Sequence, residues 1–332
     1  MRIAVDVMGG DNAPAAILQG CEQALAEHGD LHLVLCGPQE VINGFFADKD
    51  ATRITVEHAP DVISNHDSPT LAIRRMNDSS MVRAMDLVKR GECQGMVSAG
   101  STGALLAGGV FRIGRIRGIQ RPALAPVMPS TSNPWMLIDC GANVDCRPDY
   151  LPQFALMGSV YMRSVMGVKN PCVKLANIGD ESEKGNELTK AAYPLLSAIP
   201  SINFQGNIEA RDIMSGAADV VVCDGFVGNI ILKQTEGTAA ALMSMLKDVF
   251  MRSTVTKLAA AILKPGLREF KARMDYTEHG GAPLLGVRGA VIKAHGSSNA
   301  HAISRAIRQG VRMIEGNVVQ KITTELDAVI PD

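Results

Sequence analysis

The chain has 332 residues, of which 46% are hydrophobic and 20% are charged, a composition that excludes disordered and fibrous proteins. The length allows one large domain or two ordinary ones. Thirty-three Lys and Arg against 34 Asp and Glu give a net charge of −1, which argues against a nucleic-acid partner.

The cysteines and the apolar segments indicate in which cellular compartment the protein is expected. Seven cysteines occur without a CxxC pair and without a histidine placed to complete a zinc cluster, so we expect reduced thiols and no metal site. The opening segment MRIAVDVMGG lacks the long apolar region of a signal peptide, and no stretch reaches the roughly 18 apolar residues of a membrane span. We therefore expect a cytoplasmic protein.

Short apolar runs that end in Gly, Asp or Asn recur along the chain and predict buried parallel strands. These runs are 3–5, 31–35, 54–56, 96–97, 124–128, 135–138, 173–176, 220–223 and 290–292. Helical patterns lie between them at 14–27, 79–89, 103–112, 150–166, 186–197, 228–252 and 299–315. The alternation predicts one α/β domain over residues 1–332, with a mostly parallel sheet covered by helices on both faces.

Residues 250–288 depart from this alternation, because two helical patterns, 256–263 and 267–274, follow each other there. Lys264-Pro265-Gly266 predicts a break between them, so we expect an inserted helical hairpin. Its apolar residues include Leu258, Ala259, Ile262 and Leu263. With basic residues on either side, this composition fits an amphipathic element at a membrane surface, and it also fits a dimer interface.

Polar, glycine-rich turns follow six of the predicted strands, and in open α/β sheets ligands bind beyond the carboxyl ends of the strands. The turns lie at 6–14, 98–104, 139–143, 177–186, 224–229 and 293–298, so we expect them to share one cleft at one sheet edge. Segment 98–104 would place hydroxyls and free N–H groups at a helix N-terminus, which is an anion cradle. The alternative is that these are ordinary turn and cap residues. Neither a GxGxxG pattern nor a Walker A loop is present, which argues against dinucleotide and nucleoside triphosphate ligands.

Seven segments of the chain, most of them overlapping these turns, carry a resemblance to a known family. They are IAVDVMGGDNAP at 3–14, SAGSTGALLAGG at 98–109, IDCGAN at 138–143, NIGDESEKGN at 177–186, DGFVGN at 224–229, MDYTEHGGAPLLGV at 274–287 and KAHGSSN at 293–299. In order, and over almost the whole chain, they closely resemble the bacterial phosphate acyltransferases of phospholipid synthesis, the acyl-carrier-protein:phosphate transacylases.

The resemblance implies a homodimeric, three-layer α/β/α enzyme related in fold to phosphotransacetylases and to the isocitrate and isopropylmalate dehydrogenases. Such an enzyme converts long-chain acyl-acyl-carrier protein and inorganic phosphate into acyl-phosphate, with no metal or nucleotide cofactor. Its product would pass to a membrane-embedded glycerol-3-phosphate acyltransferase. The resemblance therefore favours a cytoplasmic protein that contacts the inner membrane surface through the hairpin, although the basic residues there could equally meet the acidic carrier protein.

In such an exchange the substrate phosphate is the nucleophile, so the protein need only position it and stabilise the developing oxyanion. The residues that we expect to bind phosphate are Gly9, Gly10, Ser98, Ser101, Thr102, Asn143 and Ser297. Lys184 is the expected charge partner, and a helix cap beside a solvated lysine is the alternative. Asn143 would supply an amide donor, or would serve only as a turn residue.

Three further residues are catalytic candidates. Asp224 and Asn229 flank a turn that resembles the Asp-Gly turn of phosphotransacetylases, where Asp224 would hold a phosphate proton, orient a donor or form only a structural turn. His295 would donate to the oxyanion or protonate the departing thiolate, or would bond only to backbone near a subunit interface.

Two other functions compete with this one. An NAD-dependent decarboxylating dehydrogenase of related fold would need a nucleotide fingerprint and paired metal-binding aspartates, which we do not find in the sequence. A non-enzymatic acyl-binding scaffold that recruits a membrane acyltransferase would bind acyl chains without consuming thioester. The polar turns argue against the scaffold, because a lipid binder has little use for a phosphate cradle.

Overall fold

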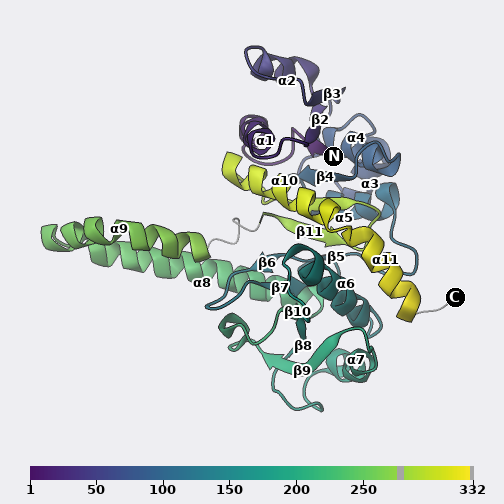
Figure 1. The fold of residues 1–332 in the computed structure, drawn as a ribbon, viewed down its shortest axis with the longest axis vertical. Coiled ribbons are helices and arrows are strands. Elements are labelled where there is room, and N and C mark those ends of the chain that lie inside the picture. Colours follow the sequence, from purple (N-terminus) through teal and green to yellow (C-terminus); the bar gives the residue numbers. More distant parts are fainter. Residues whose placement is uncertain (275–279, 330–332) are drawn as a thin grey trace.

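The computed structural model describes residues 1–274 and 280–329, and its strands form two sheets (Figure 1). The seven-stranded sheet has the order β3 (Ile54–His58), β2 (His32–Gly37), β1 (Arg2–Asp6), β4 (Gly95–Ser98), β12 (Ala290–Lys293), β11 (Ala282–Leu285) and β5 (Ala123–Leu124). The five-stranded sheet has the order β6 (Val127–Met128), β7 (Trp135–Ile138), β10 (Val220–Val222), β8 (Cys172–Asn177) and β9 (Asn203–Glu209). The α/β class with mostly parallel strands is confirmed, but the strands divide between two sheets where the sequence predicted one.

Eleven α-helices surround the sheets in the described part of the chain. They are α1 (Ala15–Glu27), α2 (Gln39–Phe46), α3 (Pro69–Arg75), α4 (Ser80–Lys89), α5 (Thr102–Gly108), α6 (Tyr150–Val165), α7 (Glu187–Ser197), α8 (Gly225–Met251), α9 (Thr254–Met274), α10 (Ala300–Glu315) and α11 (Val318–Val329). A π-helical segment, η1 (Gly109–Ile113), continues α5, and a 3-10 turn, η2 (Ile213–Ser215), follows β9. None of the helices in the described residues is long and apolar enough to cross a membrane.

The chain crosses between the sheets within the run 124–128, which was predicted as one strand. Ala125 still bonds to the first sheet by donating its N–H to the carbonyl of Pro283, whereas Pro126 already accepts from Leu137 of the second sheet. Proline has no N–H to donate, so it does not extend a ladder. The run therefore ends as β5 in one sheet and starts again as β6 in the other.

The two sheets share one hydrophobic core. Val5 from the first sheet, Val220 from the second and Phe154 from α6 belong to the same buried cluster, and all three are fully buried. Where helices must approach closely, small residues allow it: a Cβ on Gly20 of α1 would lie 2.6 Å from the Cβ of Ile303 on α10. Aliphatic strands covered on both faces explain why the chain folds with so few aromatic residues.

Helices α8 and α9 form a two-helix arm that projects from the body (Figure 1). The predicted break at residues 264–266 is wrong, because α9 runs unbroken from Thr254 to Met274 and contains Pro265. The turn comes instead at Arg252 and Ser253. There the Ser253 hydroxyl accepts from the Thr256 N–H and the Thr256 hydroxyl accepts from the Ser253 N–H, a reciprocal cap that starts α9.

The predicted hairpin boundaries also differ from the structure. Residues 282–285, which the sequence placed inside the hairpin, form β11 of the seven-stranded sheet, paired with both β12 and β5. Residues 275–279, part of the motif at 274–287, lie outside the described residues. The predicted helix 228–252 corresponds to α8, which begins at Gly225.

Candidate active site

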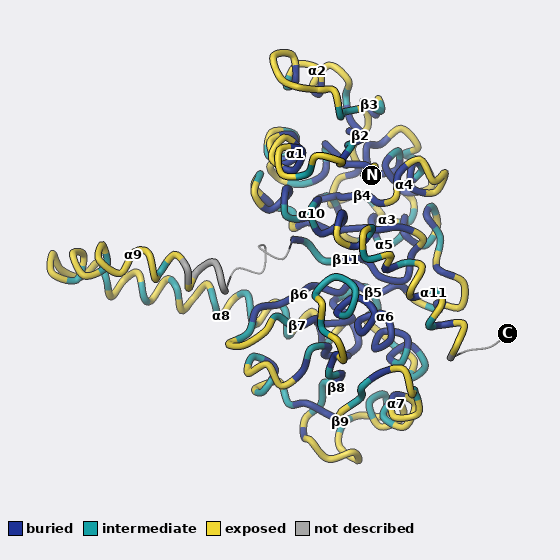
Figure 2. Tube along the Cα trace, viewed as in Figure 1, coloured by how far each residue is buried: buried dark blue, intermediate teal, exposed yellow. Residues whose placement is uncertain are grey.

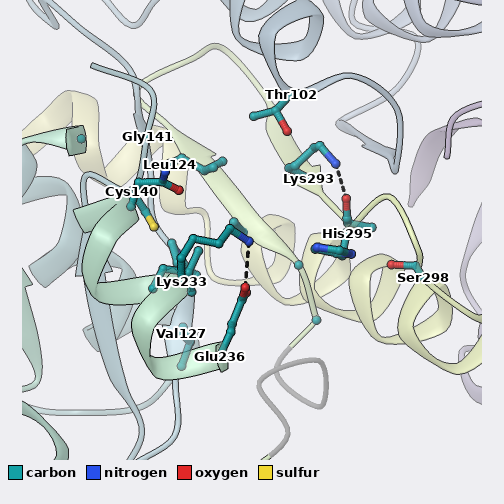
Figure 3. A pocket seen from close by; sticks show the side chains of 18 of the residues that line it. Thr102, Leu124, Val127, Cys140, Gly141, Lys233, Glu236, Lys293, His295 and Ser298 are labelled. Atoms are coloured by element: carbon teal, nitrogen blue, oxygen red, sulfur yellow. Dashed lines mark hydrogen bonds and ion pairs between the residues drawn. The ribbon is translucent and has the colours of Figure 1, made fainter. Parts of the chain in front are cut away.

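A cavity of about 350 Å³ is lined by residues that follow strands of both sheets (Figure 3). The polar lining residues are Thr102, Asn229, Lys233, Glu236, Lys293, His295 and Ser298. The apolar lining includes Leu124, Pro126, Val127, Val144, Phe226, Leu232 and Ala282. The cavity therefore combines cationic, imidazole and hydroxyl groups with a largely apolar wall.

On the first wall, the buried carboxylate of Asp6 organises the ends of β1 and β4. It accepts hydrogen bonds from the hydroxyls of Ser80 and Ser98, each at 2.6 Å. Burial raises the pKa of Asp6, against the opposing effect of these bonds. A Cβ on Gly9 would lie 2.3 Å from an Asp6 oxygen and 2.8 Å from the backbone nitrogen of Gly100, so this close turn requires glycine.

Lys293, at the end of β12, is the one lysine of this wall in the described residues, and it was not among the site residues expected from the sequence. Its ammonium donates to the carbonyl oxygens of Ala99, at 3.3 Å, and of Ala294. Burial lowers its pKa to about 8, opposed by the nearby charges of Asp6 and Asp11. An ammonium has three donors, so one remains for a ligand in the cavity.

Residues 295–298 present the imidazole of His295 to the cavity. The Ser297 N–H donates to Nδ1 of His295 at 3.3 Å, and the Ser297 hydroxyl lies 2.8 Å from the same nitrogen. Because a backbone N–H can only donate, Nδ1 is an acceptor, and the proton of the neutral ring sits on Nε2. The Asn12 side chain donates to the carbonyls of Ser297 and Ser298, and the Asp11 N–H donates to Gly296, so the 9–12 turn clamps this loop.

On the second wall, the buried carboxylate of Asp139 organises the turn after β7. It accepts the N–H groups of Leu124, Cys140, Ala142 and Asn143 and the side-chain amide of Asn143. Burial raises the pKa of Asp139, against the opposing effect of the bonds from Leu124, Ala142 and Asn143. The Asn143 amide also donates to the carbonyl of Pro122 at 2.8 Å, so its donors are engaged within the protein.

Helix α8 carries the rest of the second wall. The Asp224 carboxylate caps it by accepting the Val227 N–H at 2.9 Å, which was the structural alternative for this residue. Asn229, Lys233 and Glu236 follow at the spacing of one helix face and all line the cavity. Lys233 and Glu236 form an ion pair at 2.7 Å (Figure 3).

The structure separates the expected site residues into three groups. Thr102, Asn229 and His295 line the cavity. Those that support its walls without lining it are Gly9, Gly10, Ser98, Ser101, Asn143, Asp224 and Ser297. Lys184 is exposed in the turn after β8 and does not line the cavity, while Leu258, Ala259, Ile262 and Leu263 lie exposed on the arm.

The expectation that all six turns share one cleft is wrong, and the two-sheet topology explains why. The turns at 98–104 and 293–298 follow strands of the first sheet, and those at 139–143 and 224–229 follow strands of the second. The turn at 177–186 follows β8, which lies on the far side of β10 from β7. Within the described residues, no group of three or more His, Cys, Asp or Glu side chains is arranged to hold a metal ion.

Comparisons with known proteins agree with this architecture. Residues 1–321 match the family described as fatty acid synthesis protein. The chain is 51% identical over 332 residues to a phosphate acyltransferase of Clostridium botulinum (strain Loch Maree / Type A3), with 99% of both chains covered. It is 50% identical over 328 residues to a phosphate acyltransferase of Clostridium perfringens (strain SM101 / Type A), covering 98% of this chain and 97% of the relative.

Two solved structures share the fold. A phosphotransacetylase from Streptococcus pyogenes superposes with a TM-score of 0.59 at 18% identity, covering 97% of this chain and 94% of the other. A branched-chain phosphotransacylase from Enterococcus faecalis V583 gives a TM-score of 0.58 at 14% identity, covering 95% and 99%. At these identities the likeness concerns the fold alone, whereas the full-length relatives at about 50% identity define the family. The chain therefore belongs to the phosphate acyltransferase family.

Proposed function

We propose that this enzyme transfers a long-chain acyl group from acyl-carrier protein to inorganic phosphate, releasing acyl-phosphate and the free carrier thiol. The cavity carries the proposal, because it sets a buried lysine and a histidine against an apolar wall. Phosphate needs cationic and hydrogen-bonding groups, and a fatty acyl thioester needs apolar surface. Family membership supports the acyl transfer to phosphate.

In the proposed reaction, an oxygen of the bound phosphate attacks the thioester carbonyl carbon. The new C–O bond forms, the C–S bond breaks, and the thiolate leaves with the electron pair of that bond. The protein supplies no covalent nucleophile in this scheme, so its task is to align the two substrates and stabilise the negative charge that develops on the carbonyl oxygen.

We assign phosphate binding to Lys293, the Thr102 hydroxyl and the N-terminus of α5, since Lys293 and Thr102 line the same cavity. Lys293 replaces Lys184 in this assignment, because Lys184 does not line the cavity. Nε2–H of His295 would donate to the oxyanion or to the departing thiolate. Asn229 would supply an amide donor from the opposite wall.

The remaining expected residues would act indirectly. Ser98 is engaged with Asp6, and Asn143 with Asp139. Asp224 and Ser101 cap the helices that carry Asn229 and Thr102. In this proposal they hold the phosphate-binding groups in place and do not themselves contact phosphate.

We also propose that the enzyme works as a homodimer at the inner face of the cell membrane and delivers acyl-phosphate to a membrane-embedded glycerol-3-phosphate acyltransferase. The arm supports this part of the proposal. Its apolar side chains are uncovered, with Leu258 66% and Ile262 74% exposed, and such a surface favours a partner subunit or a lipid surface.

The test incubates the purified protein with palmitoyl-acyl-carrier protein, with and without inorganic phosphate, and without added metal or nucleotide. Free carrier thiol and acyl-phosphate are both followed. Phosphate-dependent release of thiol with a matching amount of acyl-phosphate is the expected result. Folded protein that binds the acyl carrier and forms neither product would overturn the proposal in favour of an acyl-binding scaffold.

A further inference from the structure

A segment without carboxylates borders the cavity. Residues 93–138 contain no Asp and no Glu, although the whole chain has 34 of them, and their basic residues are four arginines. These are Arg112, Arg115, Arg117 and Arg121. Because the chain as a whole is nearly neutral, these four arginines are a local excess of positive charge along the sequence, although Arg112 pairs with Asp86 of α4 at 3.7 Å.

Two of these arginines line a second hollow of about 400 Å³, together with two aromatic side chains. Arg115 and Arg121 are exposed, and Phe111 and Tyr150 form part of the same wall. The Arg121 guanidinium lies 5.9 Å from the centre of the Tyr150 ring, and the guanidinium of exposed Arg147 lies 5.6 Å from the same ring. We call these five residues the arginine surface.

The charges of the arginine surface are only partly neutralised by the protein itself. Arg147 pairs with Asp149 at 2.8 Å. Among the described residues we find no ion pair to Arg115, which donates to the carbonyl of Gln120, and none to Arg121. Two guanidinium groups, held by a carbonyl and by an aromatic ring, therefore remain available to carboxylates of a partner.

A short stretch of chain connects the arginine surface to the cavity. Pro122 lines the second hollow, and Leu124, two residues further on, lines the cavity, a separation of roughly 7 Å along an extended chain. Pro122 also accepts the side-chain amide of Asn143, and the next residue, Val144, lines the cavity with 58% of its surface exposed. A protein held on the arginine surface would thus lie close to the cavity that its thioester must enter.

We propose that the arginine surface docks the acidic protein that carries the acyl thioester. This inference rests on the proposed function and adds the place where the donor binds. Arginine and aromatic residues around a hollow are typical of protein interfaces, where guanidinium groups bind carboxylates in a fixed, two-pronged geometry. A lipid surface would favour protruding apolar groups, and in the described residues those are concentrated on the arm.

The test uses the double charge reversal Arg115→Glu/Arg121→Glu in the full-length enzyme. With palmitoyl-acyl-carrier protein we expect KM to rise roughly 10- to 100-fold while kcat changes far less, since repulsion weakens encounter and docking. With S-palmitoyl-pantetheine, which has no carrier protein, the loss in kcat/KM should be at least about tenfold smaller. Raising ionic strength should increase KM of the wild type for the carrier and reduce the difference between the two enzymes.

The matched control is Arg211→Glu, because Arg211 is an exposed arginine that follows β9 in the second sheet. It should leave KM for the carrier substrate within about twofold of wild type, as expected for a remote surface charge. The milder pair Arg115→Gln/Arg121→Gln covers the case in which charge reversal disturbs folding, and unfolding curves check each variant.

Three outcomes would overturn the docking proposal. Equal losses with the carrier and with pantetheine would make these arginines part of the site itself. An unchanged KM of the double variant for the carrier substrate would show that these arginines do not dock the carrier protein. Loss of binding to vesicles of anionic lipid with an unchanged carrier KM would assign the surface to the membrane. These three outcomes all require an active wild-type enzyme. If the proposed function itself is wrong, the wild type releases no thiol from either donor, so the two failures are distinguishable.

Discussion

Helix α8 contributes to both the cavity and the arm, and its two parts have very different surroundings. The first turns of α8 lie against the turn after β7, where a Cβ on Gly228 would come within 1.9 Å of the Asp139 carbonyl oxygen. The rest of α8 leaves the body with α9, and much of this arm is exposed (Figure 2). Large apolar side chains on it, such as Leu242 and Met245, are about 60% exposed. Local geometry in the chain thus determines the cavity, whereas the arm leaves large apolar side chains exposed.

The cavity and the arm also differ in their buried polar groups. Around the cavity, the buried carboxylates of Asp6 and Asp139 accept hydrogen bonds from hydroxyls and N–H groups. These bonds offset the free-energy cost of burying the carboxylates and hold the adjoining turns in place. The arm has no comparable buried polar group among its described residues. Substitutions at the cavity should therefore act through geometry and charge, and those on the arm through association.

The largest effect is expected for Lys293→Met. Removing the ammonium should lower kcat/KM by roughly 100- to 1,000-fold, the range seen when one preorganised donor to developing charge is lost. Steady-state assays of phosphate-dependent thiol release measure this, with Lys184→Met as the matched control at an exposed lysine. Equal activity of Lys293→Met and wild type would show that Lys293 does not take part in the reaction.

The pKa of Lys293 sharpens this prediction. Burial lowers it to about 8, so the ammonium is lost as pH rises through about 8, and activity that needs the charge should fall over the same interval. Lys293→Arg keeps its charge and should show no such fall. Because the unfolded lysine binds its proton up to about 10.5, wild-type stability should rise relative to Lys293→Met between pH 8 and 10.5, by about 3 kcal/mol in total.

At the base of α8, Gly228→Ala should be the most damaging small change to stability. The added methyl meets the backbone of Asp139 and lies 2.9 Å from the sulfur of Cys223, neither of which can move freely. We expect the free energy of unfolding to fall by about 2–3 kcal/mol, as for overpacked cores. Urea unfolding followed by circular dichroism measures it, and a loss below about 0.5 kcal/mol would contradict the tight packing described here.

Sequence patterns predicted most strands and most helices because buried aliphatic runs and polar turns are local signals, but they missed β9 and placed β11 inside the hairpin. They did not predict the second sheet, since the only sign of the crossing is Pro126 within an apolar run. Lys293 was missed because its position in a polar turn gives no sign of its burial, which depends on β4 and on Asp6 from β1. Lys184 sits in an equally polar turn, and only the strand order separates it from the cavity.

On the arm, Leu258→Glu/Ile262→Glu should weaken binding to vesicles of anionic lipid by at least about tenfold, because each change removes apolar surface worth roughly 2 kcal/mol when buried. Sedimentation with vesicles measures the binding, and light scattering measures the oligomeric state. Ile178→Glu is the control, since Ile178 is 79% exposed in the body. Loss of the dimer with unchanged vesicle binding would assign these side chains to the subunit interface.

The smallest expected effect distinguishes the free arm from a covered one. Gly237 lies on α8 with no atom within 4 Å of an added Cβ, so Gly237→Ala should raise the free energy of unfolding by about 0.5–1 kcal/mol through helix propensity alone. Gly44 of α2 has equally open surroundings and provides the control. Both variants should gain the same stability at low protein concentration. If Gly237→Ala loses its gain as concentration rises while Gly44→Ala keeps it, another copy of the chain packs against this face of the arm.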